Sequence, residues 1–155
     1  MWHFTESADS RITTLENTQM LHWTLRLIAL SLLGITLASQ ASSEDPAVYF
    51  ISPCDGATLS SPVTVSFGLR NMGIAPAGID RANTGHHHLI VDAPLPALDL
   101  PIQNDANHRH FGGGQTQTTL ELSPGSHTLQ LLLGDFSHTP HQPALTSKQI
   151  TIQVK

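Results

Sequence analysis

The sequence VTVSFGL at residues 63–69 is the clearest indicator of the fold class, because its apolar residues alternate with small or polar ones at every step. Val63, Val65, Phe67 and Leu69 occupy the odd positions. Successive side chains of a β-strand point to opposite faces, so a period of two predicts a half-buried strand. The stretch therefore indicates a sheet with one face packed on a core.

Short apolar segments on both sides of this stretch are also predicted to be strands. They lie at residues 47–51, 86–92, 116–122, 127–133 and 147–154. Turns are indicated by Asp55-Gly56 and by Ser123-Pro-Gly125. About six short strands without a helical period predict an all-β fold, a small immunoglobulin-like β-sandwich that follows an N-terminal signal peptide.

The segments between these strands are predicted to be irregular. They lie at residues 71–85, 93–107, 108–114 and 134–143. Segment 93–107 contains three prolines, which cannot donate to a sheet ladder, so it is expected to run over the surface.

The composition indicates one small domain and argues against nucleic-acid binding. The chain has 155 residues, which corresponds to a single domain. Acidic residues outnumber basic ones by 12 to 7, so the formal net charge is -5 and no basic surface is indicated. The sequence contains no Walker loop, nucleophile elbow or H-E-x-x-H motif. It therefore favours a binding protein over an enzyme, and nucleic acid is not expected as a partner.

Residues 20–41 are predicted to be a secretory signal peptide. Arg26 supplies the positive charge, residues 27–37 form an apolar run, and small residues precede the cleavage site expected near Ala41. The apolar run is shorter than the ~20 residues of a membrane span, so no span is expected after cleavage. An uncleaved anchor is the alternative. The mature protein is expected to be periplasmic or secreted.

The rest of the chain divides around this leader. Residues 1–19 are polar and are predicted to be a gene-start extension, with Met20 as the true start; a long n-region is the alternative. Residues 42–46 are predicted to be a linker, and residues 47–155 the His-rich β-sandwich domain. Cys54 is the only cysteine, so no intrachain disulfide is possible and stability must come from the β core or from a bound ion.

Histidine is the most unusual feature of the composition. Eight of the ten histidines lie between His86 and His141. His86 and His88 are two positions apart on a predicted strand, so they point to the same face with Cα atoms about 6.5 Å apart. His87 points to the opposite face and is expected to lie partly in the core.

Further histidines occur at similarly short spacings. His108 and His110 form a second H-x-H pair, and His138 and His141 bracket a Thr-Pro dipeptide whose proline stiffens the loop. Neutral imidazole is a common ligand of Zn(II) and Cu(II), so three or four converging histidines would form a metal site. The predicted metal ligands are His86, His88, His110, His138 and His141.

Structural roles are the alternative for several of these residues. His87 and His127 are expected to be structural, with ring N–H groups that hold loop carbonyls. Asp92, Asp105 and Asp135 lie near histidines in the sequence, and such carboxylates could orient a metal ligand through its second ring nitrogen.

Sulfur ligands are not expected. Cys54 lies in a turn without a neighbouring His or Met, unlike the thiolate of a blue-copper site. Met72 is the only methionine beyond the leader, which argues against a Met-rich carrier of Cu(I).

Several short motifs of the chain are together similar to those of a known family. They are Ser52-Pro53, Asp55-Gly56, Ala75-Pro-Ala-Gly78, Gly85-His-His-His-Leu89, His110-Phe-Gly112, Gly114-Gln-Thr116, Leu122-Ser-Pro-Gly-Ser-His-Thr-Leu129, Gly134-Asp135, His138-Thr-Pro-His141 and Pro143. Over residues 48–154 this set resembles the bacterial domain-of-unknown-function family numbered four-three-nine-nine.

The resemblance implies an exported, stand-alone β domain and implies no mechanism. Cys54 stands where the family has a charged or polar residue, which weakens any functional role for it. The histidines that match the family's motifs are His86, His87, His88, His110, His127, His138 and His141.

Three functions are compatible with the sequence. The leading hypothesis is a periplasmic protein that binds a divalent transition metal, copper(II) or zinc, for storage, delivery or buffering. The alternative is a metal-free binding or structural module of the envelope, which would have an envelope protein as its partner. A redox or hydrolytic metalloenzyme is the third, and only the number of histidines supports it.

Overall fold

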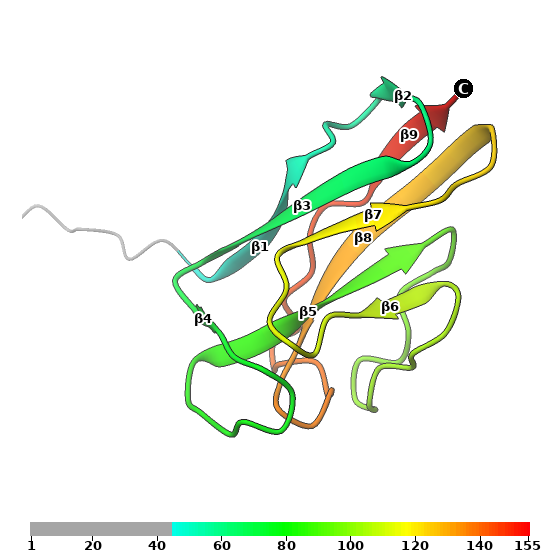
Figure 1. The fold of residues 1–155 in the computed structure, drawn as a ribbon. Coiled ribbons are helices and arrows are strands. Elements are labelled where there is room, and N and C mark those ends of the chain that lie inside the picture. The colour runs from blue at the N-terminus through cyan, green and yellow to red at the C-terminus, as the bar shows by residue number, and fades with distance from the viewer. Residues whose placement is uncertain (1–44) are drawn as a thin grey trace, which may run out of the picture. The chain divides into compact units, whose positions relative to one another are not determined.

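The computed structural model describes residues 45–155, which form strands joined by turns and loops (Figure 1). The strands are β1 (Ala47–Ser52), β2 (Thr58–Leu59), β3 (Val63–Arg70), β4 (Gly73–Ile74), β5 (Thr84–Val91), β6 (His108–His110), β7 (Gln117–Leu120), β8 (Gly125–Gly134) and β9 (Ile150–Val154). The predicted extension and signal peptide lie outside the described residues. Within residues 45–155, no helix is long and apolar enough to cross a membrane.

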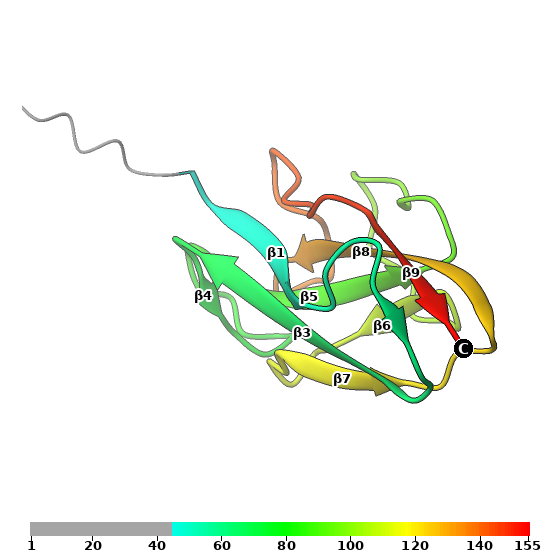
Figure 2. The same ribbon diagram turned by 90° about the horizontal axis from the view of Figure 1, so that it is seen from above.

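Two sheets pack face to face as layers (Figures 1 and 2). The smaller sheet has the strand order β1-β3-β7. The larger sheet has the order β2-β9-β8-β5-β4, and β6 pairs with β5 outside this path. The all-β, sandwich-like prediction is thus confirmed for the described residues, whereas the immunoglobulin-like detail stays a prediction.

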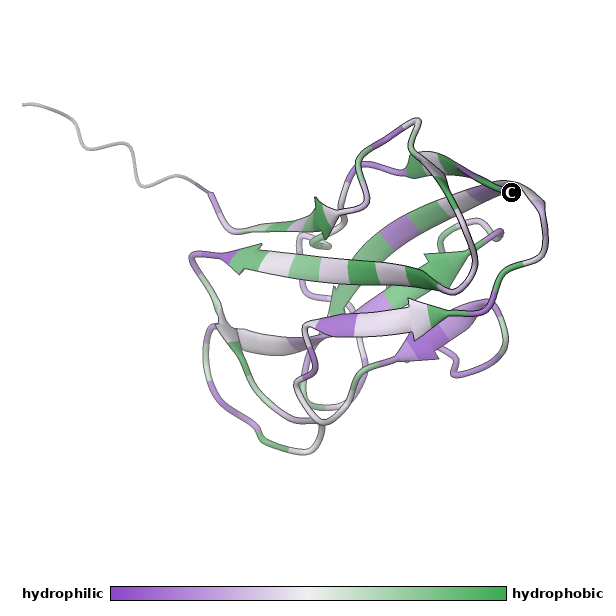
Figure 3. Cartoon of the chain, turned by 45° about the horizontal axis from the view of Figure 1, so that its top comes forward, coloured by the Kyte–Doolittle hydropathy of each residue, from purple (hydrophilic) through white to green (hydrophobic). Residues whose placement is uncertain are grey.

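The main core fills the space between the two sheets. Val63, Val65 and Phe67 of β3 are at most 2% exposed, as the alternation predicted. Leu129 and Leu131 of β8 meet them from the larger sheet and are fully buried. Bands of alternating hydropathy along β3 are visible in Figure 3. Each sheet therefore turns its apolar face inward, as burial of apolar surface requires.

A second, smaller core lies on the outer face of the larger sheet. Ile90 of β5 and Leu132 of β8 point to this face and pack with Ile102 of the loop at residues 92–107. The prolines of this loop predict that it runs over the surface, but Ile102 is only 6% exposed, so that prediction is wrong for this residue. The outer face of β5 is therefore covered by loops, and His86 and His88 point to the same face as Ile90.

Three short strands were not predicted. β2 and β4 contain two residues each, and β6 lies in a segment that was predicted to be a loop, so that prediction is wrong for residues 108–110. A strand of two or three residues is too short to show a hydrophobic period. These strands form because a longer neighbour offers them backbone partners: β9 for β2, and β5 for β4 and β6.

Candidate metal centre

Four histidines converge on one point at the outer face of the larger sheet. His86, His88, His110 and His138 each present one ring nitrogen, and these four nitrogens lie within 4.8 Å of one another. The sequence predicted all four as ligands from their spacing. Their convergence is a property of the folded chain.

Three of the four rings are placed by two neighbouring strands. His86 and His88 are two positions apart on β5, so they share a face. His110 of β6 lies directly opposite His88 in the antiparallel pair, and opposed residues point to the same side. Gly112 makes room for the His110 ring, because a Cβ at Gly112 would overlap that ring.

The fourth ring comes from the loop between β8 and β9. His138 has a backbone φ of 69°, in the left-handed region, and its Nδ1 lies 3.1 Å from Nε2 of His86. Nε2 of His88 also lies 3.1 Å from Nε2 of His86. Nε2 of His86 is therefore flanked by two other imidazole nitrogens.

The centre is buried, and several of its polar atoms have no hydrogen-bond partner. His86 and His88 are fully buried, whereas His110 and His138 are partly exposed. Nδ1 of His86, Nδ1 of His88 and Nε2 of His110 are buried without a partner. Leaving such atoms unsatisfied costs about 1–3 kcal/mol each. The two Nδ1 atoms are not the nitrogens of His86 and His88 that lie 3.1 Å apart, so an ion between those nitrogens would not relieve this cost.

The electrostatics keep the buried rings neutral. Burial, followed by the charges of the neighbouring His110 and His138, lowers the pKa of His86 to about 4. Burial likewise lowers the pKa of His88 to about 3, with His86 as the next cause. Burial also lowers the pKa of His110. At neutral pH these rings therefore carry free lone pairs, the form that binds a metal.

The spacing of the nitrogens fits coordination of a single ion. A metal–nitrogen bond of ~2.0 Å separates neighbouring nitrogens of a tetrahedral site by about 3.3 Å. Two nitrogen pairs of the centre, each at 3.1 Å, are near this value. Four imidazoles without a sulfur ligand form a donor set suited to Zn(II) or Cu(II).

The fifth predicted ligand, His141, does not belong to this group of nitrogens. A Cβ at Gly85 would lie 2.9 Å from Nε2 of His141. Gly85 and His86 are successive residues of β5, so their side-chain positions face opposite sides of the sheet. The chain after His138 therefore places the His141 ring on the side away from the metal centre.

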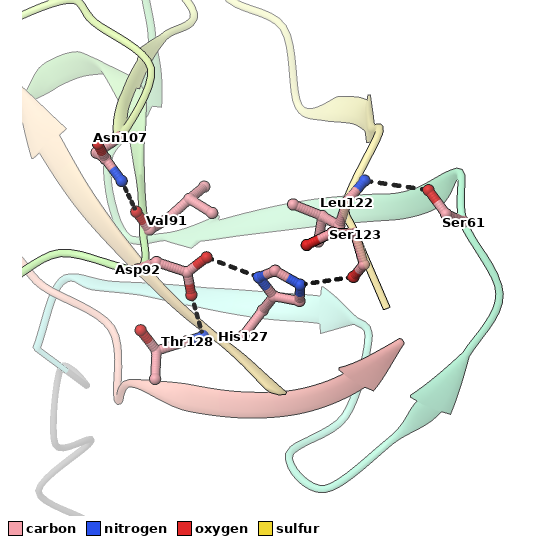
Figure 4. A network of polar contacts seen from close by, with 8 residues as sticks. All are labelled: Ser61, Val91, Asp92, Asn107, Leu122, Ser123, His127 and Thr128. Atoms are coloured by element: carbon pink, nitrogen blue, oxygen red, sulfur yellow. Dashed lines mark hydrogen bonds and ion pairs between the residues drawn. The ribbon is translucent and has the colours of Figure 1, made fainter. Parts of the chain in front are cut away.

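Two further histidines lie outside the metal centre, as expected of structural residues, but only His127 makes the predicted hydrogen bond to a loop carbonyl. The prediction is wrong for His87, because both of its ring nitrogens are buried without a partner. His87 is fully buried on the inner face of β5, with its ring 5.2 Å from that of Phe67 between centroids. His127 is nearly buried at the other end of the larger sheet (Figure 4). Its Nδ1 lies 2.6 Å from Asp92 Oδ2 and its Nε2 lies 2.8 Å from the carbonyl oxygen of Ser123.

The aspartates do not have the role that their sequence positions suggested. Asp92 contacts the ring of His127, and Asp105 contacts the ring of His108 at 3.0 Å. Neither histidine belongs to the metal centre. Asp135 instead binds the backbone of the loop that carries His138. The sequence pattern that could have predicted this role is an Asp followed two residues later by Ser137, which is typical of an Asx turn.

The contacts of His127 predict an alkaline loss of stability. Both ring nitrogens face oxygen acceptors, so the hydrogen bond to Asp92, followed by that to Ser123, raises the pKa of His127 above its ordinary value of 6.5. The protonated ring stabilises the fold below that ordinary pKa, and this contribution is lost as pH rises through the elevated one. Because Asp92 is partly exposed, we expect a loss of no more than about 1 kcal/mol.

The measurement is urea unfolding from about pH 6 to about pH 9, well below the pKa of most lysines. The wild-type free energy of unfolding should fall over this range. The variant His127→Gln cannot titrate, so its curve should lack this component. If the free energy of unfolding fell equally with pH in the two proteins, His127 would not be the source of the loss.

The comparisons with known proteins identify the family. The family model described as "Domain of unknown function (DUF4399)" matches residues 65–155. The chain belongs to this family. The match confirms the resemblance seen in the motifs, although it begins 17 residues after the start at residue 48 that the motifs suggested. All four residues of the metal centre lie within the matched DUF4399 region.

Other comparisons add little to the DUF4399 assignment. No curated protein sequence matches the chain. A solved structure, that of the endo-beta-1,4-mannanase from Thermotoga petrophila, is similar at 18% sequence identity with a TM-score of 0.44. The similarity covers 76% of this chain and 21% of that protein, so this chain spans about a fifth of its length.

Proposed function

We propose that this DUF4399 domain binds one divalent transition-metal ion, copper(II) or zinc(II), through His86, His88, His110 and His138. The observation that carries the proposal is the convergence of four imidazole nitrogens within 4.8 Å on two strands and one loop. Imidazole is a borderline ligand that suits both ions. Four protein ligands around one ion form a closed site, which fits storage, delivery or buffering better than catalysis.

We also propose that the domain performs this role in the periplasm or outside the cell. The apolar run at residues 27–37, with Arg26 before it and small residues near Ala41, supports export. The test is N-terminal sequencing of the protein recovered from the periplasmic fraction. A mature N-terminus close to Ser42 supports export, and recovery of the uncleaved chain in the cytoplasm contradicts it.

The metal proposal is tested by calorimetric titration of Cu(II) and of Zn(II) into the purified chain. We expect one ion per chain with sub-micromolar affinity for at least one metal. His138→Asn removes a ligand and keeps a residue that tolerates φ > 0, so the loop should still fold. His110→Gln removes a ligand from the strand β6. Each variant should lose more than about 100-fold in affinity, a larger loss than removal of an outer-shell partner causes.

His108→Gln is the matched control. His108 lies on β6, two residues before His110, and its ring contacts Asp105 instead of the metal centre. This variant should bind metal as the wild type does. A wild-type chain that binds neither ion, or a loss of affinity in His108→Gln equal to that in His110→Gln, would contradict the proposal.

A metal-free structural role is the alternative, and one observation favours it. The contacts of His86 Nε2 with His88 Nε2 and with His138 Nδ1, both 3.1 Å, are also hydrogen-bond distances. A neutral ring nitrogen either donates or accepts, so His86 Nε2 can form one of these two bonds. A bond between His86 and His138 would hold the loop of His138 on the sheet without an ion. Thermal unfolding separates the two functions: a metal at about 1,000 times its dissociation constant stabilises the fold by ~4 kcal/mol. An unchanged melting temperature with metal would favour the structural role.

A further inference from the structure

The side chain of Asp135 organises the loop that carries His138. Its Oδ1 accepts hydrogen bonds from the backbone N–H of Ser137 at 2.8 Å, from the Ser137 hydroxyl at 2.8 Å and from the backbone N–H of Thr139 at 3.0 Å. One carboxylate oxygen therefore binds the residues on both sides of His138. Bonds to a carboxylate are stronger than those between neutral groups.

Backbone hydrogen bonds close the same loop. The N–H of Asp135 donates to the carbonyl of Thr139 at 2.8 Å, and the N–H of His138 donates to the carbonyl of Asp135 at 3.0 Å. The φ of 69° at His138 lies in the left-handed region, which is unfavourable for a non-glycine residue. The bonds to Asp135 compensate this cost, because the turn that they define requires that conformation at His138.

Two neighbouring segments anchor the closed loop. The N–H of Gly78 donates to the carbonyl of Phe136 at 2.9 Å, and the N–H of Ile102 donates to the carbonyl of His138 at 2.9 Å. The loop is therefore a closed turn with fixed supports on two sides. Its one ring that enters the metal centre, that of His138, is held 3.1 Å from His86.

We propose that Asp135 is the positioning residue of the metal centre, which acts by holding the His138 ring in place before the ion arrives. The inference rests on the proposed function, since it assigns Asp135 a role in metal affinity. Three ligands come from paired strands and are rigid, so the entropy of ordering the site resides mainly in the His138 loop. Ordering that loop in advance raises affinity.

Substitutions of Asp135 test the inference by calorimetry. Asp135→Ala removes the acceptor and should lower metal affinity by about 10–100-fold. Asp135→Asn keeps an oxygen that can accept the same bonds and loses only the charge, so its loss should be below about 5-fold. Asp55→Ala is the matched control. Asp55 also accepts a hydrogen bond from a backbone N–H, that of Thr151 at 2.9 Å, and its substitution removes the same negative charge at a position far from Asp135 in the sequence. The control variant should bind as the wild type does.

A double-mutant cycle separates positioning from general destabilisation. If Asp135 acts through His138, Asp135→Ala should cost no further affinity in a chain that already carries His138→Asn. Additive losses in the two backgrounds would overturn the inference. So would unchanged affinity in Asp135→Ala when the wild type binds metal.

Amide hydrogen exchange of the metal-free protein distinguishes failure of this inference from failure of the proposed function. In Asp135→Ala the amides of Ser137 and Thr139 should exchange at least about 10-fold faster, since each loses a bond of ~1.5 kcal/mol. Unchanged exchange would overturn the positioning role. A wild-type chain without metal binding would overturn the role in affinity and the proposed function together, whatever the exchange shows.

Discussion

Replacement of Gly85 by alanine is expected to lower the free energy of unfolding by about 3 kcal/mol, at the upper end of the cost of overpacking. A Cβ at Gly85 would lie 2.5 Å from the carbonyl oxygen of Gly134, 2.9 Å from Nε2 of His141 and 3.0 Å from Cγ of Leu133. The first contact is with backbone, which cannot rotate away. β5 and β8 must therefore separate where they pair, and this moves His86, the next residue.

The measurement is thermal and urea unfolding without metal, followed by titration of Cu(II) or Zn(II). Gly113→Ala is the control, because the three atoms nearest to a Cβ there, at 3.0 Å or more, all belong to the side chain of exposed Gln115, which can move. Its stability should stay within about 0.5 kcal/mol of the wild type. A Gly85→Ala protein as stable as Gly113→Ala would contradict the prediction, because it would show that the space between Gly85 and the carbonyl oxygen of Gly134 can accept a methyl group.

Replacement of His87 by leucine is expected to raise stability at neutral pH by about 2 kcal/mol. Both ring nitrogens of His87 are buried without a hydrogen-bond partner, and the ring packs against Phe67 in the main core. Burying an unpaired polar group costs about 1–3 kcal/mol, and an apolar side chain of similar volume avoids that cost. His87 faces the inner side of β5, so the metal centre on the outer side should keep its affinity.

The test is urea unfolding of His87→Leu beside His87→Asn. Asparagine keeps the buried polar atoms and leaves a gap, so it should be less stable than the wild type by about 2 kcal/mol. A loss of stability in His87→Leu would show that His87 has a polar partner that stabilises the fold. A loss of metal affinity in that variant would show that the two faces of β5 are coupled.

The alternation of residue types was sufficient to predict the long strands and which way their side chains point. β3 turns inward Val63, Val65 and Phe67, which a period of two assigned to one face. The same period placed His86 and His88 on one face and His87 on the other. These predictions hold because the direction of each Cβ is set by the local backbone of an extended chain.

The pairing of strands could not be predicted from these patterns. β6 has three residues and no period of its own, and only its register with β5 places His110 opposite His88. His138 and His141 looked equivalent, since they bracket the same Thr-Pro dipeptide. The folded loop directs His138 to the outer face of β5, whereas the His141 ring lies near Gly85 on the opposite face of that strand.

Residue patterns alone were enough to predict an all-β domain, the two faces of its main strands and a set of histidines suited to metal. Which histidines meet depended on the folded chain: His86 and His88 of β5, His110 of β6 and His138 of a loop that Asp135 closes. The two kinds of prediction differ in the range of the interactions on which they depend. The direction of a side chain follows from its own backbone, whereas convergence depends on hydrogen bonds between residues far apart in the chain, which no local pattern records.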